Sequence, residues 1–220
     1  KELSYNNLLD LESALSTVSE FEYDQKQNSS TTINAVVILK HNNPCGAALG
    51  DTPADAFTKA LDCDNTSAFG GIVAFNNNVD LAAAELLSNI FLECVVATSF
   101  DKDALDILNN KKNLRLLQIN KENINEDNKS TFKSILGGIL VQETDNEIDQ
   151  INQWSYVTQK KPSTEEFNDL KFSWKICKHV KSNAIVIAKK QKTLGIGAGQ
   201  MNRVGAAKIA LDSAKDFANG

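Results

Sequence analysis

The sequence predicts an α/β protein in which helices cover a largely parallel or mixed sheet. Compact apolar runs between polar loops alternate with segments whose apolar residues recur at three- and four-residue steps, a pattern typical of strands and amphipathic helices in turn. Hydrophobic residues make up 42% and charged residues 23% of the 220 residues. The chain can therefore bury a substantial core, and its length suits about two modest α/β units.

The first half of the chain alternates helix and strand patterns. Apolar residues at helical spacing from Leu8 to Val18 predict a helix with one buried stripe. The unbroken run Ala35–Leu39 predicts a strand covered on both faces, and Asp80 has the residue type of a helix N-cap. The predicted elements, in order, are helix 8–18, a polar loop over 24–32, strand 33–39, helix 54–61, strand 72–75, helix 81–91, strand 94–97, helix 101–109 and strand 114–119.

The second half contains two polar stretches, 120–130 and 143–150. Between them, Gly137-Gly138 interrupts the apolar run 135–141, which predicts one strand with a bend. The polar residues that follow indicate a soft boundary at about 142–162 along the chain.

After this boundary, helix and strand signals resume. Ser163 with Glu166 forms a capping-box pattern that opens a helix through Cys177. Two strands, 184–188 and 193–196, are predicted to pair through a basic turn. Asn202 is the predicted N-cap of a last helix, which contains Val204, Ala207, Ile209 and Leu211.

Charge and composition exclude several classes of function. A net charge of −5 and a pI near 5.1 argue against a nucleic-acid binder that relies on general basicity. The longest apolar stretches, such as 35–39, are far shorter than the ~20 residues that span a bilayer. No two of the four cysteines have the spacing of a structural zinc site, so we expect free thiols. The sequence predicts a cytoplasmic protein without membrane contact, and its abrupt ends suggest a segment of a longer polypeptide.

The first candidate for chemistry is Lys40-His41, in a loop that follows the predicted buried strand. Open α/β sheets bind ligands at the carboxyl ends of their strands. Histidine exchanges a proton near neutrality, and an adjacent lysine favours the neutral, basic imidazole while it can also stabilise an oxyanion. Pro44 and Gly46 are expected to fix a tight turn. An ordinary surface loop remains the alternative, and the second histidine, His179, is expected to be structural.

Two glycine-rich segments are further candidates. In 67–71, Gly70 allows close backbone approach to a ligand and Phe69 offers an aromatic face, although a turn with a core phenylalanine explains the segment equally well. The segment 195–203 fails the dinucleotide pattern because Gln200 stands where a glycine is required. It still suits an anion or carboxamide ligand near Arg203, and the nearby Asn183 can both donate to and accept from an amide.

Five blocks in this order, 3–10, 40–46, 67–74, 181–186 and 195–203, resemble the transformylase part of the AICAR transformylase/IMP cyclohydrolase family. The resemblance extends over essentially the whole chain. It implies transfer of a formyl group from 10-formyltetrahydrofolate, as co-substrate, to the amine of 5-aminoimidazole-4-carboxamide ribonucleotide (AICAR) in purine (IMP) biosynthesis. It also implies a pair of cytidine-deaminase-like, zinc-free, layered α/β subdomains, no catalytic metal, and a homodimer with shared active sites.

The resemblance also implies roles for individual residues. His41 would accept the proton of the amine and Lys40 would stabilise the developing charge, as catalytic residues. The implied substrate-binding residues are Asn7, Phe69, Gly70, Glu93, Asn183 and Arg203. The subdomains would divide the chain into 1–141, a linker with a helical connection over 142–169, and the start of the second subdomain over 170–220.

This sequence departs from the family pattern in three places. An upstream block with a phosphate-binding arginine, the carboxy-terminal stretch that completes the site, and the cyclohydrolase half have no counterpart here. A nucleotide-binding fragment without catalytic competence is therefore one alternative. A zinc deaminase of related fold is the other, because Pro44-Cys45 matches half of the deaminase signature; Ala48, however, replaces its second cysteine.

Overall fold

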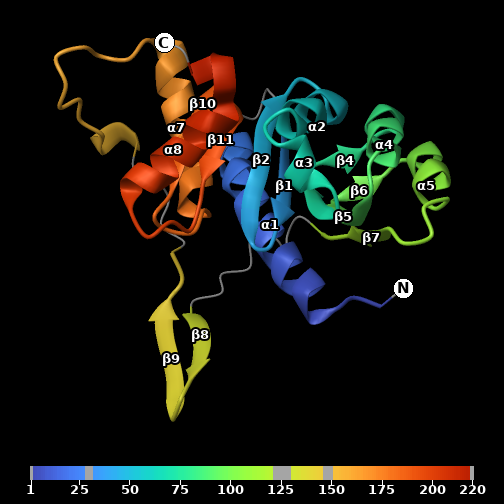
Figure 1. Cartoon of the computed structure of the whole chain (residues 1–220). Coiled ribbons are helices and arrows are strands. Elements are labelled where there is room, and N and C mark those ends of the chain that lie inside the picture. The colour runs from blue at the N-terminus through green and yellow to red at the C-terminus, as the bar shows by residue number, and fades with distance from the viewer. Residues whose placement is uncertain (1, 28–31, 121–129, 146–150, 219–220) are drawn as a thin grey trace.

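The computed structural model describes residues 2–27, 32–120, 130–145 and 151–218 (Figure 1). Its longer helices are α1 (Tyr5–Gln27), α2 (Pro53–Leu61), α4 (Leu81–Ser88), α5 (Lys102–Leu108), α7 (Thr164–Lys178) and α8 (Arg203–Ala214). The short helical segments are α3 (Asn65–Ala68), η1 (Ile151–Gln153) and η2 (Lys215–Ala218). The strands are β1 (Asn34–Lys40), β2 (Asn43–Gly50), β3 (Gly71–Phe75), β4 (Asn78–Val79), β5 (Leu92–Ala97), β6 (Ser99–Phe100), β7 (Arg115–Gln118), β8 (Ser130–Ile135), β9 (Gly138–Glu143), β10 (Ile185–Lys189) and β11 (Lys192–Gly197).

A seven-stranded mixed sheet, in the order β10-β11-β2-β1-β3-β5-β7, forms the centre of the molecule. The strands β3, β5 and β7 are parallel, whereas β1 pairs antiparallel with β3 and with β2. The prediction of a mixed sheet between helices is therefore confirmed. Since β10 and β11 join the same sheet as β1, this sheet continues across the predicted linker 142–169; the subdomain limits at 141 and 169 stay a prediction.

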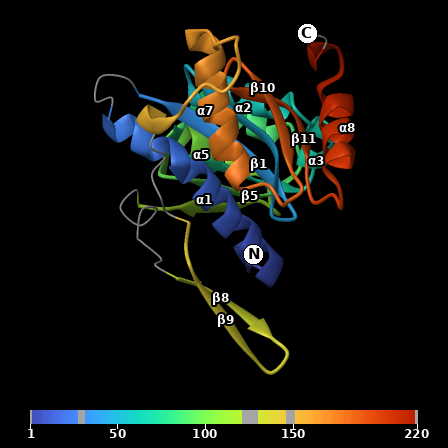
Figure 2. The same ribbon diagram turned by 90° about the vertical axis from the view of Figure 1, so that its left-hand side faces the viewer.

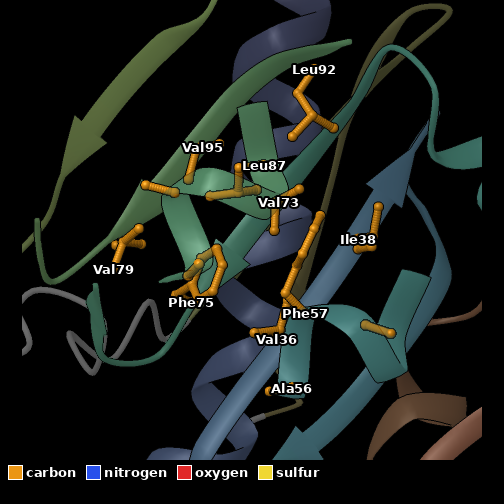
Figure 3. Packing of buried hydrophobic residues seen from close by; sticks show 14 of the residues in the cluster. Val36, Ile38, Ala56, Phe57, Val73, Phe75, Val79, Leu87, Leu92 and Val95 are labelled. Carbon is orange, nitrogen blue, oxygen red and sulfur yellow. The ribbon is translucent and has the colours of Figure 1, made fainter. Parts of the chain in front are cut away.

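Helices cover both faces of the sheet and form two cores (Figure 2). On one face α1 packs on β1 and β3 and α7 packs on β10, which buries Val18 of α1 and Ile176 of α7. The Phe21 and Phe172 rings are stacked between the two helices, with their centroids 5.6 Å apart. On the other face α2, α4 and α5 cover Val36, Val73 and their neighbours, which Figure 3 shows meeting at one centre. Burial of these apolar side chains, about 1.5–3 kcal/mol each, fixes the helices on the sheet.

Local capping signals are confirmed. The Asp80 side chain accepts from the Ala83 backbone N–H at the start of α4. Ser163 and Glu166 form the predicted capping box of α7, and Asn202 accepts from the Gly205 N–H at the start of α8. The predicted polar loop over 24–32 is wrong for 24–27, which continue α1; residues 28–31 lie outside the described structure.

The predicted turn at Pro44 and Gly46 is wrong. Both residues lie inside β2, and the chain reverses instead at His41 and Asn42, whose φ values are 53° and 59°. Because both turn residues have positive φ, the turn twists in the sense that a two-residue β-hairpin requires. Gly46 serves a different purpose: a Cβ at this position would overlap the Ala60 carbonyl of α2, so its absence brings α2 close to β2.

The single bent strand predicted for 135–141 is also wrong. Gly137, with φ 82°, and Leu136 reverse the chain between β8 and β9, which pair antiparallel as a ribbon. Figures 1 and 2 show this ribbon extending away from the rest of the molecule.

The buried face of α8 consists of alanines. Ala206, Ala210 and Ala214 are buried, whereas Val204 is 79% exposed and Leu211 50% exposed. Gly195 and Gly197 of β11 explain the difference, because a Cβ on either would overlap a carbonyl oxygen of α8. Glycine on β11 and alanine on α8 allow the backbones of the strand and the helix to approach closely. At this distance only small side chains of α8 fit against the sheet, so the larger apolar residues of the helix lie on its other faces.

Two helix–hairpin–helix units of the same design lie side by side in the sheet. The first is α1-β1-β2-α2 and the second is α7-β10-β11-α8. In each, both residues of the hairpin turn have positive φ (His41-Asn42 and Lys190-Gln191), and the register shifts just before the turn. The two turns lie at opposite ends of the sheet, because Lys192 pairs with Ala48, near the end of β2 that is distant from His41.

Among the described residues, no helix is long and apolar enough to cross a membrane.

Candidate functional site

The predicted site residues lie along one edge of the sheet. Lys40 ends β1 and His41 begins the turn after it. Phe69 and Gly70 precede β3, and Glu93 lies at the start of β5. This edge is the carboxyl end of β1 but the amino end of β3 and β5, because β1 runs antiparallel to β3. Lys40-His41 therefore lies at the carboxyl end of a buried strand, as expected, but the neighbouring strands β3 and β5 present their amino ends at this edge.

Lys40 is fixed against the turn that precedes β3. Its Nζ donates to the Phe69 carbonyl oxygen at 2.7 Å, and the Gly70 N–H donates to the Phe91 carbonyl oxygen at 2.8 Å. The Phe69 and Phe91 rings lie 5.2 Å apart, and Phe69 remains 58% exposed. An ammonium group and an open aromatic face are thus held together, a combination that suits a flat ligand carrying negative or developing negative charge.

Asn7 and Glu93 form a second polar pair on this edge. The Asn7 Nδ2 donates to Glu93 Oε2 at 2.6 Å, while Asn7 Oδ1 accepts from the Ser4 backbone N–H at 3.1 Å. Asn7 itself is buried, with 4% of its surface exposed. Arg115 donates from Nη1 to the Glu93 carbonyl oxygen at 3.3 Å and so supports the strand that carries this carboxylate. Both amide ends of Asn7 are therefore engaged, and its orientation is fixed.

A hollow of about 220 Å³ opens beside Lys40 and His41. Residues of β2, α3, β11 and α8 and the segments next to them complete its wall, among them Asn43, Cys45, Cys63, Asp64, Ser67, Ile196 and Ser213. The predicted residues outside this wall are Asn7, Phe69, Gly70, Glu93, Asn183 and Arg203. Of the predicted site residues, the pocket therefore brings together only Lys40 and His41.

Burial disfavours the thiolate form of the two cysteines in the pocket wall. Burial raises the pKa of the Cys45 thiol to about 12, with the Asp64 carboxylate adding to the shift. Burial likewise raises the pKa of Cys63 to about 11. A thiol acts as a nucleophile or metal ligand only as the thiolate, so burial disfavours both roles for these cysteines. Both are free thiols, as predicted.

The segment that carries Asn183 adjoins the first hairpin. The Lys181 N–H donates to Asn43 Oδ1 at 3.1 Å, and Asn183 Nδ2 donates to the Gln200 carbonyl oxygen at 2.9 Å. Arg203 is the first residue of α8 and is exposed. The segment that carries Asn183 thus contacts the first hairpin through Lys181 and Asn43, whereas Arg203 is not among the residues of the pocket wall.

Sequence patterns missed two residues that shape this edge. The Asp10 carboxylate accepts from the Asn42 backbone N–H at 2.6 Å, and Phe91 contacts Phe69 as described above. Asp10 sits in the opening block 3–10, but nothing in its local pattern indicates a partner 32 positions away. Only the contact between α1 and the hairpin reveals it.

His179 is structural, as expected. Its Nε2 lies 2.9 Å from Glu20 Oε1, and Lys178 reaches the same oxygen at 2.9 Å, so α1 and α7 are tied at this point. Burial raises the pKa of Glu20, but hydrogen bonds and charges from His179 and Lys178 outweigh it and hold that pKa below its ordinary value. Within the described part of the chain, no three His, Cys, Asp or Glu side chains are grouped so that they could hold a metal ion.

Comparison with known proteins gives consistent results. The family model described as AICARFT/IMPCHase bienzyme matches residues 1–213. The bifunctional purine biosynthesis protein PurH of Prochlorococcus marinus strain MIT 9515 is 61% identical over 220 residues, which cover 100% of this chain and 43% of the relative. The PurH of P. marinus subsp. pastoris strain CCMP1986 / NIES-2087 / MED4 is 63% identical over the same coverage. The chain thus spans less than half the length of these curated relatives.

Among solved structures, RibD of Acinetobacter baumannii (form 1) matches with a TM-score of 0.39 and 17% identity, over 48% of this chain and 35% of that chain. A second crystal form of the same protein gives a TM-score of 0.38. A likeness of this size supports no conclusion about fold or function.

Proposed function

The chain belongs to the AICARFT/IMPCHase bienzyme family, and on this premise we propose that the full-length protein transfers a formyl group from 10-formyltetrahydrofolate to the 5-amino group of AICAR. The observation that carries the proposal is the Lys40-His41 pair, held in a pocket at one edge of the sheet beside the exposed ring of Phe69. This chain would supply the formyltransferase part, in de novo purine biosynthesis, and the cyclohydrolase activity would belong to the remainder of the protein.

In the proposed mechanism, His41 accepts a proton from the amine as the amine nitrogen bonds to the formyl carbon. Lys40 stabilises the negative charge that develops on the formyl oxygen. The bond between the formyl carbon and N10 of the folate then breaks, and N10 takes up a proton. Asn7, Glu93 and Asn183 would orient the carboxamide and its neighbours, and Phe69, Gly70 and Arg203 would shape the nucleotide pocket.

The finer fold assignment is also a proposal. The repeat of the helix–hairpin–helix unit supports two deaminase-like subdomains without zinc. We propose the limits 1–141, 142–169 and 170–220 for the subdomains and their linker, although α7 (Thr164–Lys178) crosses the second limit. In this interpretation, the first unit supplies the Lys40-His41 turn and the second supplies Asn183 and Arg203. A zinc deaminase of related fold remains the competing proposal.

One experiment separates these proposals. The full-length protein, assayed with AICAR and 10-formyltetrahydrofolate, should form formyl-AICAR and tetrahydrofolate in equal amounts, and metal analysis should find no stoichiometric zinc. Release of ammonia with one zinc per chain would identify a deaminase. Binding of AICAR without any turnover would leave a nucleotide-binding protein only.

Substitution of Arg203 by alanine in the full-length protein should weaken binding of AICAR more than binding of folate. The reason is that an exposed arginine at the start of α8 can reach an anionic nucleotide at a distance from the folate ring. Isothermal titration with each ligand separately measures the two affinities. Equal losses for both ligands would indicate a folding defect, and unchanged affinities would remove Arg203 from the site.

We further propose that the protein is a homodimer with shared active sites. The β8–β9 ribbon supports an assembly, because Phe132 is 72% exposed, Leu136 fully exposed and Ile139 67% exposed, and a two-stranded ribbon alone is only marginally stable in water. Specific activity of the full-length protein should then fall on dilution below the dimer dissociation constant, as followed by sedimentation. Constant specific activity in a monomeric sample would contradict the shared site.

A further inference from the structure

The turn that carries His41 is held by a carboxylate from α1. Asp10 Oδ1 accepts from the Asn42 backbone N–H at 2.6 Å. With the Asn42 side-chain amide oriented to satisfy its hydrogen bonds, its Nδ2 also donates to Asp10 Oδ1 at 2.8 Å and to the Leu9 carbonyl oxygen at 3.2 Å. Asp10 is half-buried. The Asp10 carboxylate therefore accepts hydrogen bonds from two donor groups of the turn.

This support matters because the turn contains no glycine. His41 and Asn42 both have positive φ, a conformation that costs a residue with a Cβ roughly 1–2 kcal/mol. Asparagine tolerates it better than histidine does. Without a partner for the Asn42 N–H, the turn would open toward other conformations, and the imidazole would lose its place beside Lys40.

The second unit has a corresponding contact between a helix carboxylate and its hairpin turn, but this turn does not carry the Lys40-His41 pair. Asp169 of α7 accepts from the Lys190 N–H at 2.9 Å and from the Gln191 N–H at 2.7 Å. Asp10 and Asp169 are each the sixth residue of their helix, counted from Tyr5 and from Thr164. The fold therefore uses the same contact twice, and only the first copy holds a histidine.

We propose that Asp10 is a positioning residue, which holds the His41-Asn42 turn so that the His41 imidazole stays in the pocket beside Lys40. The inference rests on the proposed function, since it assigns a purpose to the contact in formyl transfer. Asp10 acts through the backbone of the turn and does not touch the reacting atoms. Its carboxylate is needed as a hydrogen-bond acceptor, so an amide oxygen in the same place can replace it.

The test compares Asp10→Ala, Asp10→Asn and Asp169→Ala in the full-length protein. Asp10→Ala should lower kcat by about ten- to a hundredfold with little change in KM, since a misplaced base about 1 Å away costs on the order of 10² in rate. Asp10→Asn should recover most of kcat, because its Oδ1 still accepts from the Asn42 N–H. Asp169→Ala is the matched control: it removes the same contact at the other end of the sheet and should keep near wild-type kcat.

Backbone hydrogen exchange gives a second readout that is independent of activity. Asp10→Ala should speed exchange at residues 41–43 and leave 189–192 unchanged, and Asp169→Ala should do the reverse. Asp10→Ala combined with Asn42→Gly should regain part of kcat, because glycine adopts positive φ without the steric cost.

Three results would overturn the inference: wild-type kcat in Asp10→Ala, equal losses of kcat in Asp10→Ala and Asp169→Ala, or unchanged exchange at 41–43. An inactive wild-type protein whose exchange pattern still responds as expected would instead overturn the proposed function, and Asp10 would then hold the turn for another purpose.

Discussion

Replacing His41 with alanine in the full-length protein should lower turnover by about a hundred- to ten-thousandfold, the usual range for a positioned general base. The amine of AICAR is conjugated to an imidazole ring and is a poor nucleophile, so its proton must leave as the new bond forms. Among the residues that line the pocket, His41 is the one whose type exchanges protons near neutrality. Binding of AICAR should change much less, because the lost interaction belongs mainly to the transition state.

The measurement is single-turnover formyl transfer with both ligands saturating, so that product release does not mask the chemical step. His179→Ala is the matched control, since this histidine ties α7 to Glu20 of α1 and lies outside the pocket wall. It should lower the unfolding midpoint while it keeps the rate. A near wild-type rate in His41→Ala would show that another group takes the proton.

Replacing Lys40 with methionine should lower the rate of the chemical step by about 10²–10³-fold, which is comparable to the effect of losing one oxyanion-stabilising donor. Methionine keeps most of the apolar stem but removes the ammonium that donates to the Phe69 carbonyl oxygen. The negative charge that develops on the formyl oxygen then has no ammonium group to stabilise it. The turn before β3 also loses one hydrogen bond. The rate should therefore fall more than the affinity for either ligand.

The second unit again supplies a control. Lys189 ends β10 as Lys40 ends β1, but it lies at the opposite end of the sheet and outside the pocket wall. Lys189→Met should leave single-turnover rates unchanged. If both methionine variants lose rate equally, the effect of Lys40 reflects the stability of a hairpin and not charge stabilisation, and the proposed role of Lys40 fails.

Local patterns predicted most of the helices and strands. The run Ala35–Leu39 became β1, and the caps at Asp80, Ser163 and Asn202 begin the helices that they were expected to begin. These predictions succeed because the physical cause lies within a few residues: a side chain accepts from an N–H three positions away, or an apolar run fills one strand.

The same patterns failed where a distant contact decides the outcome. The pattern did not indicate which face of α8 is buried: Val204 and Leu211 are exposed, because Gly195 and Gly197 of β11 leave room only for alanines. The turn expected at Pro44 and Gly46 lies at His41-Asn42, since β2 must begin at Asn43 to pair with Lys40. Neither outcome is visible in the residues of the segment itself.

For the candidate site, the sequence by itself determined the residue types, their order and the family, because motifs such as Lys40-His41 are contiguous in the chain. The tertiary structure decided which of these residues meet and how they are held. Asn7 and Glu93 are 86 positions apart, and Lys181 and Asn43 are 138 positions apart. Hydrogen bonds act over about 3 Å, so partners at such separations are set by the antiparallel pairing of β1 with β2 and β3 and by the helices that cover them.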